Sequence, residues 1–533
     1  MSKLLTLLVA SPFLGAALVA LIPRNFQFVI RLIALLSTAI SMALSIYLFA
    51  VFQPGFGAEV HYQHKVPWVE SLGINYYVGV DGLNVGLVLM AAIVGFAATA
   101  VCWEIRERVK EFYFLLLIMT GGIIGAFASL DLFFFFVFHE LALIPTFIMI
   151  GVWGRGEQKN YATFKMTLYL TLGALIALVG LIALYLQSGA KTFDIVALTK
   201  HVRANPIGLG TQHLIFPWLL FGFGILVSLW PFHTWAPIGY GAAPTATAML
   251  HAGVLKKFGL YGLIRIAIPL LPDAAQSWMN IIAVLCLGNI LFVGWVAMRQ
   301  KDLNLLIGNS SVAHMGFVFL GIASFNLIGL TGAVVVMVAH GFLAALTFAL
   351  SGYLYNKGGQ LTLSEMGGYL KRMPFVGAVL VMAMMAGCGL PGFANFVGEL
   401  MVFFSAFKKF PVATALALWG ALVIGAIYML RAIRSILHGP APEGHPGLID
   451  AGAIEPDSWM PAAIFHWGWR KLPFALLLSA LLLFGFYPGL LTEKAKHSAQ
   501  QILDVAARVP EKPVTPPRPP PNMRKQASTN PGR

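Results

Sequence analysis

Charged residues are scarce in this chain of 533 residues: Asp, Glu, Lys and Arg together make up 11%, whereas 59% of the residues are hydrophobic. A soluble globular domain usually has about a quarter of its residues charged. Cysteine is rarer still, and Cys102, Cys286 and Cys388 fall in or at the edge of different apolar runs without CxxC spacing. That distribution argues against an iron–sulfur centre or a thiol redox pair in this chain.

Several cofactor motifs are also missing. The chain has no P-loop, no G-x-G-x-x-G flanked by a strand and a helix, and no H-E-x-x-H motif, which mark nucleotide, dinucleotide and zinc sites. We therefore expect no cofactor and no metal in this chain, so that an ion gradient or partner subunits must drive it. The net charge of +14 does not indicate a nucleic-acid partner, because the basic residues sit in short loops between apolar runs, where they set membrane topology.

Long hydrophobic runs are what the chain has in abundance, and about fourteen of them are long enough to cross a bilayer as helices. This predicts an all-α polytopic membrane protein embedded in the lipid bilayer. The runs lie near residues 4–22, 29–51, 80–103, 112–129, 131–153, 163–187, 213–238, 242–268, 277–297, 303–325, 327–354, 374–408, 411–436 and 472–491. An even number puts both termini on one side, and the Lys and Arg of the opposite loops mark the cytoplasm. We expect a cell inner membrane protein with periplasmic termini.

Helix breakers interrupt two of these runs. Pro231 lies in the seventh, within Leu229–His233, and Gly389-Leu390-Pro391-Gly392 lies in the twelfth. A break at membrane depth frees backbone hydrogen-bonding groups, which then need protein or water around them. Because the two breaks stand five helices apart, they indicate an internal repeat of the kind that transporters build from discontinuous helices.

Two carboxylates lie inside apolar runs, where a charge is costly unless it is paired or hydrated. Glu140 sits in the first half of the fifth run, and Glu399 follows the break in the twelfth. We interpret both as proton-handling groups; the alternative for Glu140 is a structural carboxyl bonded to a neighbouring helix. Glu399 stands beside an unwound segment, which supplies freed backbone groups and water.

Lys256 and Lys257 are adjacent within the eighth run. Consecutive helix residues point about 100° apart, so we expect one to face a polar interior while the other snorkels or meets a partner. A desolvated lysine can load and release a proton near neutral pH, which makes both candidate carriers. Arg265, two turns beyond Lys257, is expected to anchor that helix end near the membrane edge.

Further candidates are histidines and one more lysine. His314 and His340 lie in successive runs. Each is either a proton relay, because imidazole passes a proton between its two nitrogens, or a satisfied interhelical hydrogen bond. His233 at the first break and His251 in the eighth run are weaker candidates for a partner or relay. Lys165 either complements the carboxylate of the fifth run or snorkels to the cytoplasmic edge.

Together these residues resemble the antiporter-like membrane subunits of respiratory complex I, the NADH-quinone oxidoreductase. The resemblance leans towards the M-type subunit, which is equivalent to mitochondrial subunit 4, and covers nearly the whole chain up to about residue 493. Its motifs are Val80-Asp81-Gly82, Phe138 to Pro145, Trp230-Pro231-Phe232-His233-Thr234-Trp235, Ala243-Pro244-Thr245-Ala246, Ala252 to Gly259, Ser310 to Gly316, and Gly389 to Gly392 followed by Gly398-Glu399.

This resemblance implies fourteen helices with two inverted five-helix repeats, each built round a broken helix. The expected parts are three N-terminal helices (1–111), a first half-channel repeat (112–268), a second (269–436), a loop with the last helix (437–493) and a Pro-rich basic tail (494–533). It also implies a proton path driven from a separate quinone site, with other membrane-arm subunits as partners. In that path Glu140, Lys257 and Glu399 are the charged groups, and His314 and His340 link them.

One position departs from the family, which usually carries a lysine four residues before Trp230 as the partner of the glutamate at Glu140. This chain has Leu226 there. Either another cation such as Lys165 or Lys256 serves Glu140, or the first half-channel works differently or not at all. His251 also resembles the sister subunits more than the M-type.

The expected function is a proton-translocating membrane-arm subunit of a complex I-like NADH-quinone oxidoreductase, an enzyme subunit without a redox site of its own. Two alternatives stay open. One is a subunit of a cation/proton antiporter or a membrane-bound hydrogenase. The other is a structural paralogue that has lost conduction, which the leucine at position 226 allows.

Overall fold

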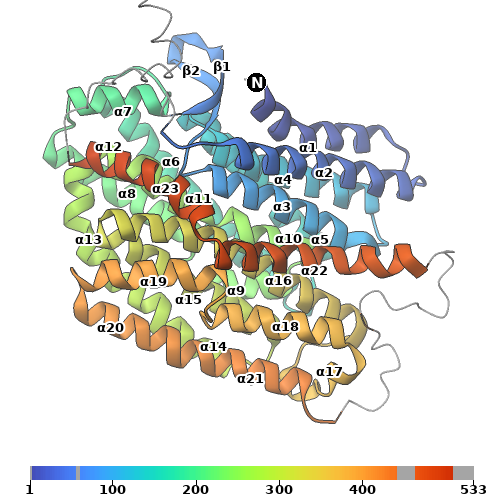
Figure 1. Ribbon diagram of the computed structural model, residues 1–533. Helices are drawn as coiled ribbons and strands as arrows, with labels where there is room; N and C mark the ends of the chain where they lie inside the picture. The colour runs from blue at the N-terminus through green and yellow to red at the C-terminus, as the bar shows by residue number, and fades with distance from the viewer. Residues whose placement is uncertain (1–2, 56–59, 441–449, 451–462, 508–533) are drawn as a thin grey trace, which may run out of the picture.

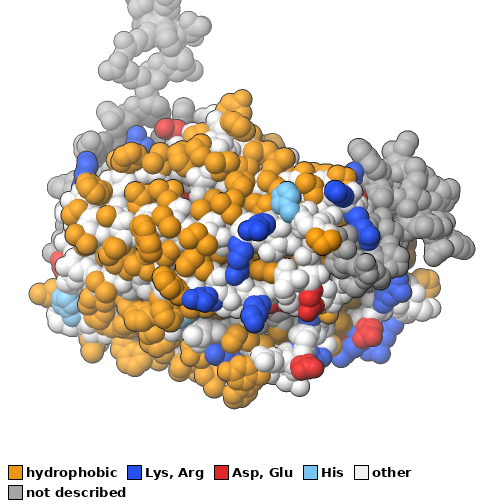
Figure 2. Space-filling model, turned by 90° about the horizontal axis from the view of Figure 1, so that it is seen from below, with side chains coloured by type: hydrophobic (Ala, Val, Ile, Leu, Met, Phe, Trp, Pro, Cys, Tyr) orange, Lys and Arg blue, Asp and Glu red, His pale blue; other side chains and the backbone are white. Residues whose placement is uncertain are grey.

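The computed structural model of the chain describes residues 3–55, 60–440, 450 and 463–507. Long helices lie side by side across the molecule (Figure 1), and eleven helices among the described residues are long and apolar enough to cross a membrane. Hydrophobic side chains cover much of the face seen in Figure 2, and most of its Lys and Arg side chains gather towards the right of the view. This pattern suits a bilayer around the helices and water at the basic end.

Three helices open the chain: α1 (Leu4–Leu21), α2 (Gln27–Val51) and α3 (Val85–Val101). Between α2 and α3 the chain forms an antiparallel hairpin of the strands β1 (His61–Val69) and β2 (Ile74–Val80). The apolar runs do not predict this hairpin, because it lies between two spans and its first strand is mostly exposed. It leads directly into the turn at Asp81 that opens α3.

Five spans follow, and the fourth of them is broken. They are α4 (Val109–Ala128), α5 (Leu132–Trp153), α6 (Lys159–Ser188), the pair α8 (Leu209–Val227) and α9 (Trp235–Ala242), and a helix made of α10 (Thr245–Leu250), α11 (Lys257–Gly262) and α12 (Ile268–Leu270). A short amphipathic helix, α7 (Ile195–Ala204), connects α6 to α8. Two π-helical turns, His251–Leu255 and Leu263–Ala267, interrupt the fifth of these spans.

The next five spans also have a broken fourth member. They are α13 (Pro272–Leu287) with α14 (Gly294–Arg299), α15 (Leu303–Ser324), α16 (Leu327–Gly358), the pair α18 (Pro374–Gly387) and α19 (Ala394–Phe407), and α20 (Pro411–Trp419) with α21 (Ala426–Leu437). The short α17 (Tyr369–Arg372) precedes α18. Equivalent helices of the two sets stand five spans apart. Because five is an odd number, each helix of the second set crosses the membrane in the direction opposite to its equivalent in the first. With α22 (Ala463–Phe486) as the last span, this confirms the predicted fourteen helices, the inverted repeats and the breaks in spans seven and twelve.

One boundary of the sequence-based division is wrong. Residues 494–533 were expected to be a Pro-rich tail, but helix α23 (Gly489–Ala506) includes the first part of that segment. Its apolar side chains, among them Leu491, Ala499 and Ile502, are buried, and it packs against α16. Charged and polar residues on its other face lower its mean hydropathy, which hides it from a search for spans. The Pro-rich residues from 508 onward lie outside the described part of the chain.

Helices α15 and α16 form the centre of the molecule. Almost every residue of both helices is buried, and α16 packs against α3, α15, α19, α22 and α23. His314 on α15 and His340 on α16 are therefore surrounded by protein rather than by lipid.

Candidate functional site

The two adjacent lysines of the eighth span are both fully buried, and they point to different helices. Lys257 Nζ donates to the carbonyl of Ala252 at 2.6 Å and lies 2.9 Å from His340 Nδ1 on α16. Lys256 Nζ donates to the hydroxyl and the carbonyl of Ser311 on α15, at 2.8 and 3.1 Å. Neither side chain snorkels to a membrane edge. Both lie in the protein interior, each bonded to a neighbouring helix.

A π-helical turn just before the lysines sets these directions. The backbone N–H of Lys256 bonds to the carbonyl of His251 at 3.2 Å, five residues earlier. Such a bulge inserts an extra residue into the helix, and π-bulges occur frequently at functional sites. Gly253 lies in this turn, and a side chain there would press on the backbone of Gly341 on α16. The close approach of the two helices brings Lys257 within reach of His340.

His340 and His314 lie against each other, with 5.4 Å between ring centroids. His314 Nδ1 is 2.8 Å from the carbonyl of Ser310, and its Nε2 is 3.1 Å from the carbonyl of Gly387. Carbonyl oxygens only accept, and a neutral imidazole has only one N–H to donate. Only the protonated ring can donate to both carbonyls at once.

The broken twelfth span supplies one of those carbonyls. Gly389 and Gly392 have φ of +70° and +101°, a left-handed conformation that glycine adopts without the penalty of a side chain. The break leaves the Gly387 carbonyl outside the regular helix ladder, where it accepts from His314. The break in the twelfth span therefore links α18 to α15 through this hydrogen bond.

Glu399 lies on the far side of His314. Its Oε1 is 3.8 Å from His314 Nε2, and it has no hydrogen-bond partner among the described residues. Glu399, His314, Tyr428 and Cys388 line a cavity of about 10 Å³, which is close to the space of one water molecule. Lys257, His340, His314 and Glu399 thus form one buried line, with room for water at its end.

The broken seventh span is held by a residue that the sequence analysis missed. Asn289, in the ninth span, accepts from the backbone N–H of Trp230 at 2.7 Å and donates to the carbonyls of Ser228 and Val312 at 3.0 Å each. It satisfies groups that the break frees. The sequence feature that could have identified Asn289 is an amide side chain in an otherwise apolar run. Ser311 was also missed, because a serine in a helix carries no comparable signal.

Glu140 lies apart from the buried line. Its side chain is 29% exposed on a face of α5 where Leu141, Ile144 and Ile148 are also exposed. Its ion partner among the described residues is the adjacent His139, with Nδ1 3.3 Å from Oε1. The Glu140 carboxylate therefore faces outwards from the bundle.

The structure does not bring Lys165 to Glu140. Lys165 Nζ lies over the ring of Tyr161, 5.7 Å from its centroid. Leu226, at the position of the family's lysine, is buried. His233 is buried at the first break with its ring edge against Phe292, 6.1 Å between centroids, and it does not join the line.

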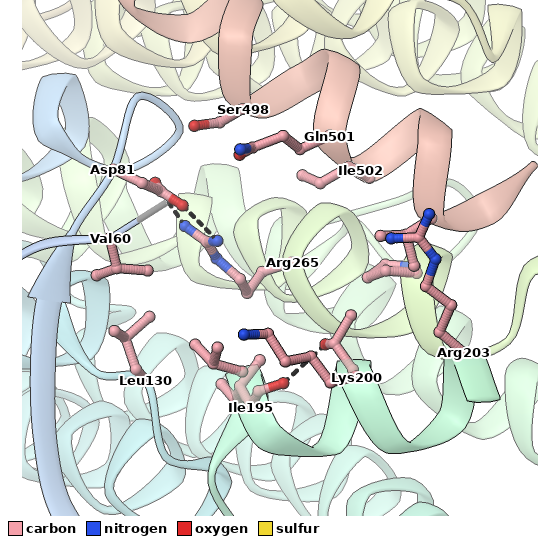
Figure 3. A pocket seen from close by; sticks show the side chains of 14 residues that line it. Val60, Asp81, Leu130, Ile195, Lys200, Arg203, Arg265, Ser498, Gln501 and Ile502 are labelled. Atoms are coloured by element: carbon pink, nitrogen blue, oxygen red, sulfur yellow. Dashed lines mark hydrogen bonds and ion pairs between the residues drawn. The ribbon is translucent and has the colours of Figure 1, made fainter. Parts of the chain in front are cut away.

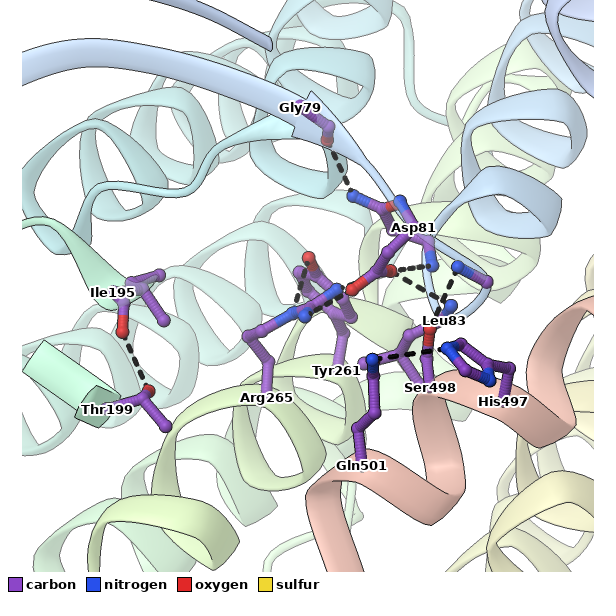
Figure 4. Close-up of polar contacts among 12 residues, drawn as sticks. Gly79, Asp81, Leu83, Ile195, Thr199, Tyr261, Arg265, His497, Ser498 and Gln501 are labelled. Carbon is purple, nitrogen blue, oxygen red and sulfur yellow. Dashed lines mark hydrogen bonds and ion pairs between the residues drawn. The ribbon is translucent and has the colours of Figure 1, made fainter. Parts of the chain in front are cut away.

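A second charged site closes one end of the eighth span. Arg265 Nη1 is 2.5 Å from Asp81 Oδ2, and its Nη2 is 2.7 Å from Asp81 Oδ1 (Figures 3 and 4). Asp81 Oδ1 also accepts from the backbone N–H groups that open α3, and Arg265 Nε donates to the Tyr261 hydroxyl. Arg265 therefore anchors the helix end through an ion pair.

A cavity of about 100 Å³ lies beside this pair (Figure 3). Lys200 and Arg203 of α7 line it, together with Ser498 and Gln501 of α23. The cavity separates two surface helices that are far apart in the sequence, and the Asp81–Arg265 pair forms its inner wall.

A family model described as NADH:quinone oxidoreductase/Mrp antiporter, TM, matches residues 129–425, more than half of the chain. The chain belongs to this family. The matched segment of this family member contains Glu140, Lys257, His314, His340 and Glu399. The family assignment also makes the chain an integral membrane protein.

Two curated relatives match the family member over most of both chains. The NAD(P)H-quinone oxidoreductase chain 4 of a Picosynechococcus species is 35% identical, covering 92% of this chain and 89% of its own length. The NADH-quinone oxidoreductase subunit M of Pseudomonas aeruginosa is 34% identical, covering 94% of this chain and 98% of its own length.

Solved structures agree on the fold. A chain of respiratory complex I from Thermus thermophilus superposes with a TM-score of 0.82 at 28% identity, covering 95% of this chain and all of that one. A chain of the Mrp complex from a Dietzia species gives a TM-score of 0.80 at 20% identity, covering 96% of this chain and 99% of that one. The second likeness is one of fold alone.

Proposed function

We propose that this chain is a proton-translocating membrane-arm subunit of a NADH-quinone oxidoreductase of the complex I type. Protons pass from the buried lysines through His340 and His314 to Glu399. The observation that carries the proposal is the buried line of four groups. Lys257 lies 2.9 Å from His340, the His340 and His314 rings lie 5.4 Å apart between centroids, and His314 lies 3.8 Å from Glu399. Burying ionisable side chains inside a membrane protein is energetically costly, and a purely structural bundle does not need them.

The chemistry of each step follows from the donors and acceptors. Lys257 as an ammonium gives a proton to the lone pair of His340 Nδ1 and is left as a neutral amine. His340 passes a proton on to His314, whose two carbonyl partners favour the imidazolium form. Glu399 then takes the proton from His314 Nε2, directly or through a water in the small cavity that both residues line. Each transfer moves one proton and breaks no heavy-atom bond.

The relatives support assigning the driving reaction to partner subunits. Their names are those of an NAD(P)H-quinone and an NADH-quinone oxidoreductase subunit, so NADH oxidation, quinone reduction and every redox cofactor are proposed to reside elsewhere in the assembly. The outward Glu140, on an apolar face of α5, suits contact with another membrane-arm subunit that alters its pairing. The basic loops support a bacterial inner membrane location with the termini on the periplasmic side.

The test uses the assembled complex in sealed vesicles. Lys257→Ala and Glu399→Gln should each lower the number of protons pumped per electron, because each interrupts the line. Lys408→Ala is the control, since Lys408 is exposed and lies outside the line. Unchanged pumping in both variants, with wild-type quinone reduction, would show that the chain is a scaffold.

The same vesicles separate this proposal from a cation/proton antiporter subunit. The proposal predicts pumping that depends on quinone reduction and not on sodium or potassium. Exchange of protons for one of these cations without electron transfer would overturn it in favour of the antiporter.

A further inference from the structure

The cavity beside the Asp81–Arg265 pair has a polar wall to which three parts of the chain contribute (Figure 3). Lys200 comes from α7, Arg265 from the eighth span, and Ser498 and Gln501 from α23. Its volume of about 100 Å³ holds several water molecules, because one water needs about 10–15 Å³. The cavity can therefore take a small polar ligand, and the groups around it select the kind.

Cations outnumber carboxylates on this wall. Lys200, Arg203 and Arg265 line the cavity, and Asp81 is the one acidic residue among the described residues that line it. Both oxygens of that carboxylate are already bonded. Asp81 Oδ1 accepts from Arg265 and from two backbone N–H groups that open α3, and Oδ2 accepts from Arg265. The wall therefore favours a ligand with negative charge.

Several hydrogen-bond donors around the cavity are left without an acceptor. The Lys200 ammonium has no hydrogen-bond or ion partner in the part of the chain that the structure describes. Arg265 uses three of its five N–H donors, two on Asp81 and one on the Tyr261 hydroxyl, so two remain. The Ser498 hydroxyl accepts from a backbone N–H of the Asp81 turn at 3.0 Å, which leaves its hydrogen to donate. A ligand with several acceptor oxygens satisfies all of these groups.

Helix spacing brings the donors of the two surface helices to facing sides of the cavity. Lys200 and Arg203 stand three residues apart on α7, and Ser498, Gln501 and Ile502 stand three and four residues apart on α23. Residues at these spacings share one face of a helix. Because the apolar side chain of Ile502 lies among the polar groups, the local dielectric constant is lower than in water, and attraction between charges is stronger there.

We propose that this cavity binds a phosphate group, which joins α7 to α23 beside the Asp81–Arg265 pair. A phosphate presents oxygens in several directions, so it accepts from the ammonium, guanidinium and hydroxyl donors of all three parts of the wall. Arginine and lysine are the side chains that proteins use to bind phosphate. A carboxylate has only two oxygens, which lie in one plane, and it reaches fewer of these donors. The inference does not depend on the proposed proton path.

Two sources can supply the phosphate. Helix α7 is amphipathic, and amphipathic helices lie in the plane of the bilayer surface, at the level of the lipid headgroups. The phosphate of an anionic phospholipid reaches the cavity from there. Inorganic phosphate reaches it from water, because Lys200 is exposed. A zwitterionic headgroup suits the site less, since its own cation is repelled by the basic residues of the wall.

The test measures the binding of two phosphate probes to the full chain, purified in detergent and freed of lipid. The probes are inorganic phosphate and a short-chain phosphatidylglycerol, titrated at constant ionic strength. Chloride and a short-chain phosphatidylcholine are the reference ligands. We expect saturable binding of at least one phosphate probe and of neither reference ligand. Binding of phosphatidylglycerol alone assigns the site to a lipid, binding of inorganic phosphate alone assigns it to the free ion, and mutual displacement assigns it to both.

Variants of one exposed lysine connect the binding to the cavity. Lys200→Gln should raise the dissociation constant about tenfold, because it replaces a cation by a neutral group. Tenfold corresponds to about 1.4 kcal/mol, close to the low end for a hydrogen bond to a charged group. Lys200→Arg should keep the binding. Lys496→Gln is the matched control, since Lys496 is an exposed lysine of α23 that does not line the cavity.

Three results would overturn the proposal. They are the absence of saturable binding of either phosphate probe, binding of chloride as tight as that of phosphate, and equal affinity in the wild type and Lys200→Gln. None of them bears on the proposed function, because proton pumping by the assembled complex is measured separately.

Discussion

The side-chain oxygen of Asn289 accepts a hydrogen bond from the backbone N–H of Trp230 at 2.7 Å, and so joins the ninth span to the break in the seventh. Asn289→Leu should destabilise the protein, because it leaves buried backbone groups of the seventh span and of α15 without their partner. The expected cost is about 1–3 kcal/mol for each group left unsatisfied. Thermal unfolding of the purified protein in detergent measures it.

Asn309→Leu is the control for this prediction. Asn309 is also a buried amide, but within the described part of the chain its side chain bonds only to the Leu305 carbonyl of its own helix. Loss of the Asn309 amide should lower the stability of the protein clearly less than loss of the Asn289 amide. Equal destabilisation in the two variants would mean that Asn289 does not hold the break.

The Asp81–Arg265 pair gives a second prediction. Arg265→Leu leaves the Asp81 carboxylate buried without its counter-ion, and breaking a buried pair in this way costs about 3–5 kcal/mol. Combining it with Asp81→Asn should recover part of that loss, since no uncompensated charge then remains. Unfolding of the two single variants and the double variant measures the coupling between the residues; additive effects would contradict it.

His340 gives a prediction about transport. His340→Phe keeps a ring of similar size between Lys257 and His314 but removes both nitrogens, so the ratio of protons to electrons should fall to the level of Lys257→Ala. His213→Phe is the control, because His213 is exposed at the start of α8. A full ratio in His340→Phe would mean that protons leave Lys257 by another route.

Asp131 gives a prediction about pH. It caps α5 from the connection after α4, and burial raises the pKa of its carboxyl from 3.8 to about 6, although backbone N–H groups of Asn75, Phe133 and Phe134 bond the charged form. A raised pKa means that the folded state binds this proton more tightly than the unfolded state. The contribution is fully present below pH 3.8 and is lost as the pH rises through about 6.

Asp131→Asn should remove this dependence while keeping a good cap residue. The melting temperature of the wild type should therefore fall relative to that of the variant between about pH 4 and pH 6. Parallel melting curves across that range would contradict the assignment.

The membrane spans and their two breaks could be predicted because they depend on local composition. A run of apolar residues is long enough to cross a bilayer or it is not, and Pro231 or the glycines around Pro391 stop a helix wherever they stand. Glu399, Lys257 and the two central histidines stood out for a related reason, since ionisable groups in such runs are rare.

The directions of the side chains could not be predicted in the same way. Whether Lys256 meets α15 or the lipid depends on a π-helical turn, and that turn depends on Gly253 lying against the backbone of Gly341 far along the chain. The outward position of Glu140 and its distance from Lys165 are likewise set by how α5 and α6 pack.

The single π-helical turn before Lys256 sends neighbouring ammonium groups to two helices whose histidines touch. Two positive charges on consecutive buried residues repel each other strongly in a medium of low dielectric constant. In the proposed path, one lysine would therefore carry its proton while the other is neutral, and the two would release protons towards Glu399 one at a time.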